Sequence, residues 1–88
     1  MISQLYAVRD RKTGAYSYPQ PSPLQPEDYF ESLRRATLAG KIERAQAVDA
    51  EIYYVGSYDD TTATFSPKER EYLGCLGDFL GPDDGKTN

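Results

Sequence analysis

The pattern of hydrophobic and polar positions at the start of the chain has the two-residue period of a strand. Residues 3–9 alternate in this way, and residues 15–18 repeat the alternation after a turn at residues 10–14. Gly14 can take the positive φ angle that a bulged hairpin turn needs. We therefore expect a first β-hairpin between residues 3 and 18.

The pattern then changes to a proline-rich stretch and to helical spacing. Residues 19–26 hold four of the six prolines, which indicates a stiff connector more strongly than a ligand for a proline-binding domain. Over residues 26–39 apolar positions recur at helical spacing, and Pro26 suits the first position of a helix. This predicts an amphipathic helix that covers one face of a sheet. Its expected inward residues are Tyr29, Phe30, Leu33, Ala36 and Thr37.

A short helical turn and a second hairpin are predicted next. Residues 41–48 suit a helical turn, and residues 51–58 have the strongest strand pattern of the chain. Gly56 within that strand indicates a bulge or a close backbone approach. A turn at 59–62 and a returning segment at 63–65 complete the hairpin. The expected inward residues of the helical turn are Ile42, Ala45 and Val48.

The last predicted element is a helix over residues 66–79. Ser66 and Glu69, with a proline between them, match a capping box, and apolar residues follow at helical spacing. Residues 81–88 are polar and are expected to form a tail outside a single domain at 1–80. The expected fold class is α+β. Two β-hairpins form a mostly antiparallel four-stranded sheet, with one helix between them and a short C-terminal helix.

Composition argues against catalysis. The chain has no histidine and one cysteine, so it lacks the common nucleophile–base pairs and structural zinc sites. Cys75 is expected to be a buried small residue, in keeping with a reducing cytoplasm. The pairs Asp59-Asp60 and Asp83-Asp84 suit turns better than a cation site. We expect a cytoplasmic protein that is not an enzyme, with no cofactor, metal, signal peptide or membrane span.

The charge of the chain is divided between its halves. The net charge is −4, with +2 in residues 1–44 and −6 in residues 45–88. Because an acidic protein repels phosphates, nucleic-acid binding needs a local basic patch, and the first half is where one can form.

The first hairpin combines basic and aromatic residues, which suits a single strand of nucleic acid. Charges can follow its phosphates while rings stack on its bases. The alternative is a solvated turn whose tyrosines pack against the helix, and local evidence favours that alternative. The candidate binding residues of the hairpin are Tyr6, Arg9, Arg11, Lys12, Tyr16 and Tyr18, with Arg34, Arg35, Lys41 and Arg44 added if the helix lies near.

Two segments resemble a known family. Residues 5–17 (LYAVRDRKTGAYS) and 51–60 (EIYYVGSYDD) are similar, in order and spacing, to the small non-structural protein of gokushoviruses, which are single-stranded DNA phages of the family Microviridae. The resemblance implies a protein made in the infected cell, absent from the virion, that binds DNA during single-stranded genome production. It implies no catalytic residues.

A second function class stays open. The acidic second half is also compatible with a protein-interaction module that binds a host or phage protein, by mimicry of nucleic-acid charge. A homodimer is compatible with either function, because a small core and exposed strand edges favour association.

Overall fold

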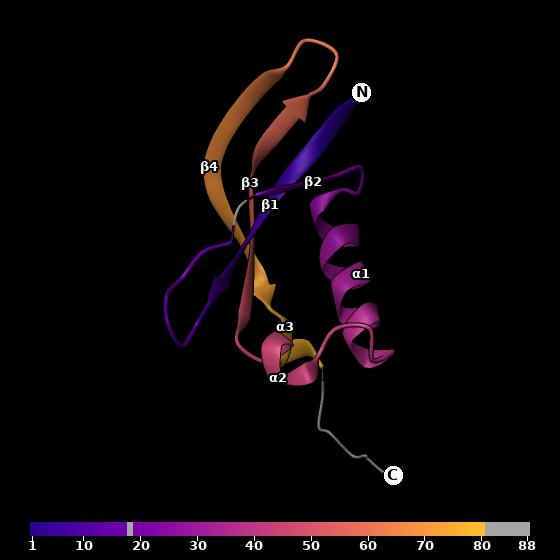
Figure 1. Ribbon diagram of the computed structural model, residues 1–88, viewed down its shortest axis with the longest axis vertical. Coiled ribbons are helices and arrows are strands. Elements are labelled where there is room, and N and C mark those ends of the chain that lie inside the picture. The colour runs from indigo at the N-terminus through magenta and orange to yellow at the C-terminus, as the bar shows by residue number, and fades with distance from the viewer. Residues whose placement is uncertain (18, 81–88) are drawn as a thin grey trace.

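The fold is an antiparallel sheet with one long helix against it (Figure 1). A computed structural model describes residues 1–17 and 19–80. The strands lie in the order β2-β1-β3-β4, and the molecule is elongated, with extents of 49 × 25 × 16 Å. This confirms the predicted α+β class. The elements are β1 (Ile2–Asp10), β2 (Gln20–Ser22), α1 (Pro26–Leu38), α2 (Arg44–Ala47), β3 (Ala50–Asp59), β4 (Thr64–Cys75) and α3 (Leu76–Phe79).

β1 pairs with β3 along its length, and its regular partner within the first hairpin lies later in the chain than predicted. Over residues 15–17, the described part of the predicted returning strand, one isolated bridge joins Tyr16 to Arg9, and Ser17 N–H donates to the Val8 carbonyl at 2.8 Å. The regular ladder is formed by Gln20–Ser22, inside the segment predicted to be a connector. Pro21 is tolerated there because β2 is an edge strand, and an edge strand can lack an N–H on its outer side without loss of a hydrogen bond to its neighbour.

The helix α1 follows its prediction, and its aromatic residues pack on the sheet. The Tyr29 ring stacks on Tyr6 with centroids 3.9 Å apart, and Phe30 meets Phe79 edge to face at 5.2 Å. Of the residues predicted to point inward from the helical turn, Ile42 packs against the core as expected, whereas Ala45 and Val48 are exposed. Ala47 is 1% exposed and Val48 is 47% exposed, because the helix begins only at residue 44 after an extended Glu43.

The predicted helix at residues 66–79 is wrong over most of its length. The segment continues as β4 to Cys75, and only Leu76–Phe79 is helical. It pairs with β3 from Thr64 to Cys75, with irregularities in register. Two features allow a strand here: an edge strand tolerates Pro67, and the glycines at 74 and 77 weaken a helix.

Two buried positions agree with their predictions. Gly56 has a φ of 145°, and an added Cβ would lie 2.5 Å from the Ser66 carbonyl oxygen, which confirms the close approach. Cys75 is fully buried, and its thiol donates to the Val48 carbonyl at 3.4 Å. The core beneath α1 is formed by Ala47, Ile52, Leu76 and Leu80.

Candidate nucleic-acid interface

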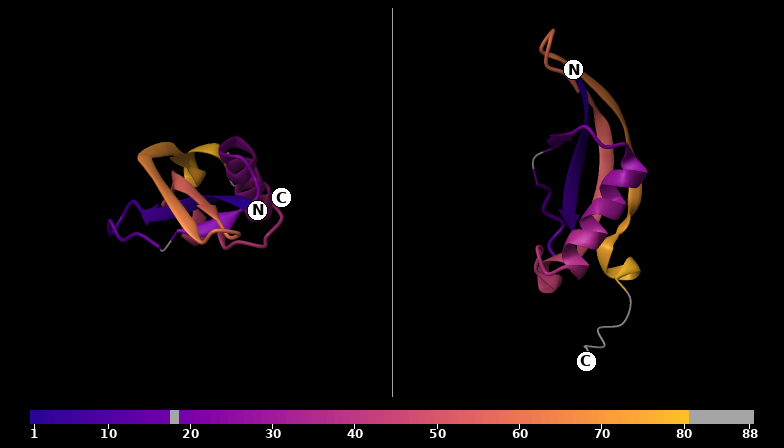
Figure 2. Two further views of the ribbon diagram at one scale, coloured as in Figure 1. Left: turned by 90° about the horizontal axis from the view of Figure 1, so that it is seen from above. Right: turned by 90° about the vertical axis from the view of Figure 1, so that its right-hand side faces the viewer.

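The sheet has one covered face and one open face. Tyr6 lies on the covered face, where it stacks on Tyr29 of α1, and Tyr54 lies beside it at 5.7 Å. Successive residues of a strand point to opposite faces, so Tyr53 and its cross-strand partner Tyr72 lie on the open face. Figure 2 shows α1 to one side of the strands. The face away from α1 is therefore accessible to a partner.

Three tyrosines form a row across this open face, and we call Tyr16, Tyr53 and Tyr72 the tyrosine row. The Tyr53 ring centroid lies 5.9 Å from that of Tyr16 and 5.3 Å from that of Tyr72. Tyr16 is 45% exposed and Tyr72 is 50% exposed. Desolvation raises the pKa of Tyr53 above that of a free phenol, which agrees with a ring packed between its two neighbours. Half-exposed rings in a row present several stacking surfaces together.

An arginine joins the tyrosine row from the edge strand. The Arg70 guanidinium carbon lies 4.6 Å from the centroid of Tyr16 and 5.7 Å from that of Tyr53, and Arg70 also donates to the Tyr16 hydroxyl. A cation over an aromatic ring is held without losing its charge. Sequence reasoning missed Arg70, Tyr53 and Tyr72 as site residues. Arg70 and Tyr72 are two residues apart, so in a strand they share a face. This spacing was not used because a helix was predicted for that segment.

Two of the predicted binding residues, Arg9 and Arg11, form ion pairs with carboxylates. Arg9 lies opposite Glu51 in the ladder and donates to it at 2.6 Å. Arg11 lies 3.6 Å from the second Glu51 oxygen and donates to Asp78 at 3.2 Å. The hydrogen bond that Arg9 donates to Glu51 raises the pKa of Arg9, and the one that Arg11 donates to Asp78 raises the pKa of Arg11. This Arg–carboxylate chain of Arg9, Glu51, Arg11 and Asp78 has no net charge.

Two cations, Lys12 in the first turn and Arg70 at the tyrosine row, have no carboxylate partner among the described residues. Lys12 lies in the turn, where its N–H donates to the Asp10 carboxylate at 2.8 Å. Within residues 1–17 and 19–80, neither the Lys12 ammonium nor the Arg70 guanidinium has a carboxylate within ion-pair distance. In these ranges, Arg70 is therefore an unneutralised cation at the tyrosine row, and Lys12 is an unneutralised cation in the first turn.

Tyr6 does not belong to the interface, which corrects the sequence hypothesis. It is 1% exposed, and its hydroxyl donates to the Leu24 carbonyl at 2.6 Å. Burial raises its pKa well above that of a free phenol. Tyr18, another predicted residue, lies outside the described part of the chain.

The remaining predicted cations lie on other elements. Arg34 and Arg35 belong to α1, and both donate to Glu31, at 2.8 and 3.0 Å. These bonds, led by that from Arg34, lower the Glu31 pKa to about 2. Lys41 follows α1, and Arg44 donates to the Leu80 carbonyl at 3.5 Å. Arg34 and Arg35 therefore lie on the helix side of the sheet, apart from the tyrosine row.

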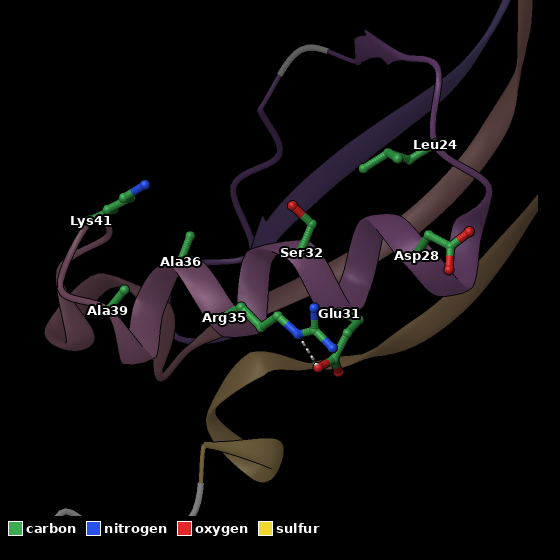
Figure 3. A pocket seen from close by; sticks show the side chains of 8 residues that line it. All are labelled: Leu24, Asp28, Glu31, Ser32, Arg35, Ala36, Ala39 and Lys41. Carbon is green, nitrogen blue, oxygen red and sulfur yellow. Dashed lines mark hydrogen bonds and ion pairs between the residues drawn. The ribbon is translucent and has the colours of Figure 1, made fainter.

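A polar groove of about 550 Å³ runs along α1, on the helix side (Figure 3). It lies between the segment at Leu24 and the end of the helix at Lys41. In the described residues, His, Cys, Asp and Glu do not gather in threes where a metal ion could be held. The helices described there are all too short or too polar to cross a membrane.

Comparison with known proteins gives one match. The model of a family described as Phage ORF5 protein matches residues 3–79. No curated protein matches the chain, and no solved structure does.

Proposed function

The chain belongs to the Phage ORF5 protein family, and from this premise we propose that it binds single-stranded DNA through the open face of its sheet. The observation that carries the proposal is the tyrosine row with the Arg70 guanidinium over two of its rings. Stacking on aromatic rings recognises unpaired bases of any sequence, and arginine adds both a charge and a planar surface.

The charge distribution supports the same surface. Arg70 supplies positive charge at the rings, and Lys12 adds another cation in the first turn. Glu71 instead pairs in register with Tyr54, which lies on the helix side. Strand alternation thus places the basic residue of this stretch with the tyrosines and an acidic neighbour on the other face. A protein of net charge −4 can in this way offer a locally cationic face.

The role of such binding follows from the resemblance to the small non-structural protein of gokushoviruses. We infer that the chain coats or escorts single strands during genome replication in the host cytoplasm and is absent from the virion. Base stacking suits that task because it does not depend on sequence. The covered face, with α1 on it, has no part in this contact.

The test compares two charge reversals on opposite faces. Fluorescence anisotropy with a labelled single-stranded oligonucleotide measures binding by wild type, Arg70→Glu and Arg34→Glu. We expect Arg70→Glu to weaken binding by about tenfold or more, since it removes a cation and a stacking surface. Arg34→Glu makes the same charge change on α1, at a residue that does not line the groove, and should leave the affinity within about twofold, since long-range effects are screened.

Equal losses in both variants would show that total charge, and not the open face, controls binding. Absence of binding by wild type at low salt would overturn the proposed function itself. Circular dichroism of both variants confirms that they are folded.

A further inference from the structure

The groove along α1 has short side chains along its floor. Ser32 and Ala36 lie one helical turn apart and line it, with Ala39 beyond them (Figure 3). Short side chains at this spacing let another helix approach closely, because they leave no ridge. The groove therefore has a shape into which another helix can pack.

The groove carries opposite charges at its two ends. Asp28 lines it near the start of α1, and Lys41 lines it just past the end. Neither side chain has an ion-pair partner in the part of the chain that the structure describes. The surface is acidic at one end and basic at the other, so it is complementary to a reversed copy of itself.

We propose that a second copy of this chain packs its α1 antiparallel against this groove and forms a two-fold dimer. A two-fold axis midway between Ser32 and Ala36 places position 28 opposite position 40, next to the partner's Lys41. At about 1.5 Å per residue, the helical part of the contact, from Asp28 to Leu38, spans about 15 Å, and an Asp28–Lys41 pair lies near each end. The geometry satisfies both unpaired charges at once.

The charges favour a second copy over nucleic acid as the occupant. Asp28 and Glu31 line the groove beside Arg35 and Lys41, so its charge balances and it does not attract a polyanion. A helix-to-helix dimer also leaves both tyrosine rows exposed, because α1 lies on the other side of the sheet (Figure 2). Two open faces would then bind two stretches of one strand.

Sedimentation equilibrium of the full chain, from micromolar to millimolar concentration, tests the dimer without DNA. We expect a concentration-dependent shift from the mass of one chain to that of two. Asp28→Lys or Lys41→Glu alone should raise the dimer dissociation constant by about tenfold or more, because each places like charges together at both ends. The double variant D28K/K41E reverses both partners and should restore most of the affinity.

Two further variants separate this contact from other effects. Glu27→Lys changes the neighbouring first-turn acid, which does not line the groove, and should leave the dimer intact. Ser32→Trp fills the groove and should prevent association without any change of charge.

A wild type that stays monomeric at millimolar concentration overturns the proposal, and so does a double variant that does not recover. Oligonucleotide binding by Lys41→Glu distinguishes the two proposals. If it weakens while the mass is unchanged, the groove belongs to a nucleic-acid site and the dimer is wrong. If the wild type dimerises but does not bind DNA, the dimer proposal is supported and the proposed function is wrong.

Discussion

At the residue scale, position in the sheet decides what each tyrosine does. Tyr6 is enclosed under α1, and its hydroxyl holds the Leu24 carbonyl at the start of the helix. Tyr72 is half exposed and lies in the tyrosine row. The same side chain thus stabilises the fold on one face and is offered to a partner on the other.

A substitution at Tyr6 should affect the stability of the fold, whereas one at Tyr72 should affect DNA binding. Tyr6→Phe should lower the free energy of unfolding by about 1 kcal/mol, since the Leu24 carbonyl loses its donor, and should leave DNA binding unchanged. Tyr72→Ala should weaken binding to single-stranded DNA by about tenfold, because one stacking surface is lost. Urea unfolding and anisotropy titration measure the two effects. Unchanged DNA affinity of the Tyr72→Ala variant would show that Tyr72 is not part of the interface.

Glu51 restrains the cations of the hairpin. It lies between Arg9 and Arg11, and 14% of its side chain is exposed. Glu51→Gln keeps the shape and removes the charge that competes with a phosphate. We expect tighter DNA binding and a salt dependence that is steeper by roughly 0.7 in log–log slope, as expected for one more phosphate contact. The salt titration of both proteins measures this, and weaker binding by the variant would show that Glu51 positions the arginines for DNA.

At the scale of elements, the hairpin of β3 and β4 depends on one close contact. Gly56 has a φ of 145° and lies against the Ser66 carbonyl, whereas Gly40, with a φ of 80°, has open space around it. Both positions strain an L side chain, but only the first also has a steric clash.

The two glycines form a matched pair for mutagenesis. Gly56→Ala should cost about 3 kcal/mol of unfolding free energy or prevent folding, because strain and clash add. Gly40→Ala should cost only about 1 kcal/mol from its left-handed conformation. Chemical denaturation measures both. Equal costs would mean that the hairpin shifts to accommodate the added methyl group.

The strand β4 shows where local sequence signals fail. Ser66 and Glu69 match a helix cap, yet the segment pairs with β3, because a ladder with an existing strand outweighs the local preference of a short, glycine-weakened helix. Its outer edge has Pro67 and alternating charges, which protect an edge strand from pairing with other chains. The element type was therefore decided by the tertiary partner.

At the scale of the whole molecule, the proposed DNA binding by an acidic protein depends on a local separation of charge between the faces of the sheet. Few cations are unneutralised on the open face, so the electrostatic contribution should be small. We expect single-stranded DNA to be bound with a log–log salt slope of about −1.5 to −2, which corresponds to two or three phosphate contacts. Duplex DNA of the same sequence should bind more weakly, since its bases are not free to stack.

Anisotropy titrations over a range of salt concentrations, with both forms of DNA, test this expectation. A slope near zero would exclude phosphate contacts. Preference for the duplex would contradict the stacking role of the tyrosine row.

The sequence by itself determined the α+β class, the helix α1, the strand β3 and the close approach at Gly56, because each depends on periodicity or on one residue's conformational freedom. It also placed basic and aromatic residues in the first hairpin. Only the tertiary structure decided which tyrosines are buried, that Arg9 and Arg11 are neutralised by Glu51 and Asp78, and that Arg70 joins the row. Those outcomes depend on which strands pair and which face the helix covers, and local patterns do not carry that information.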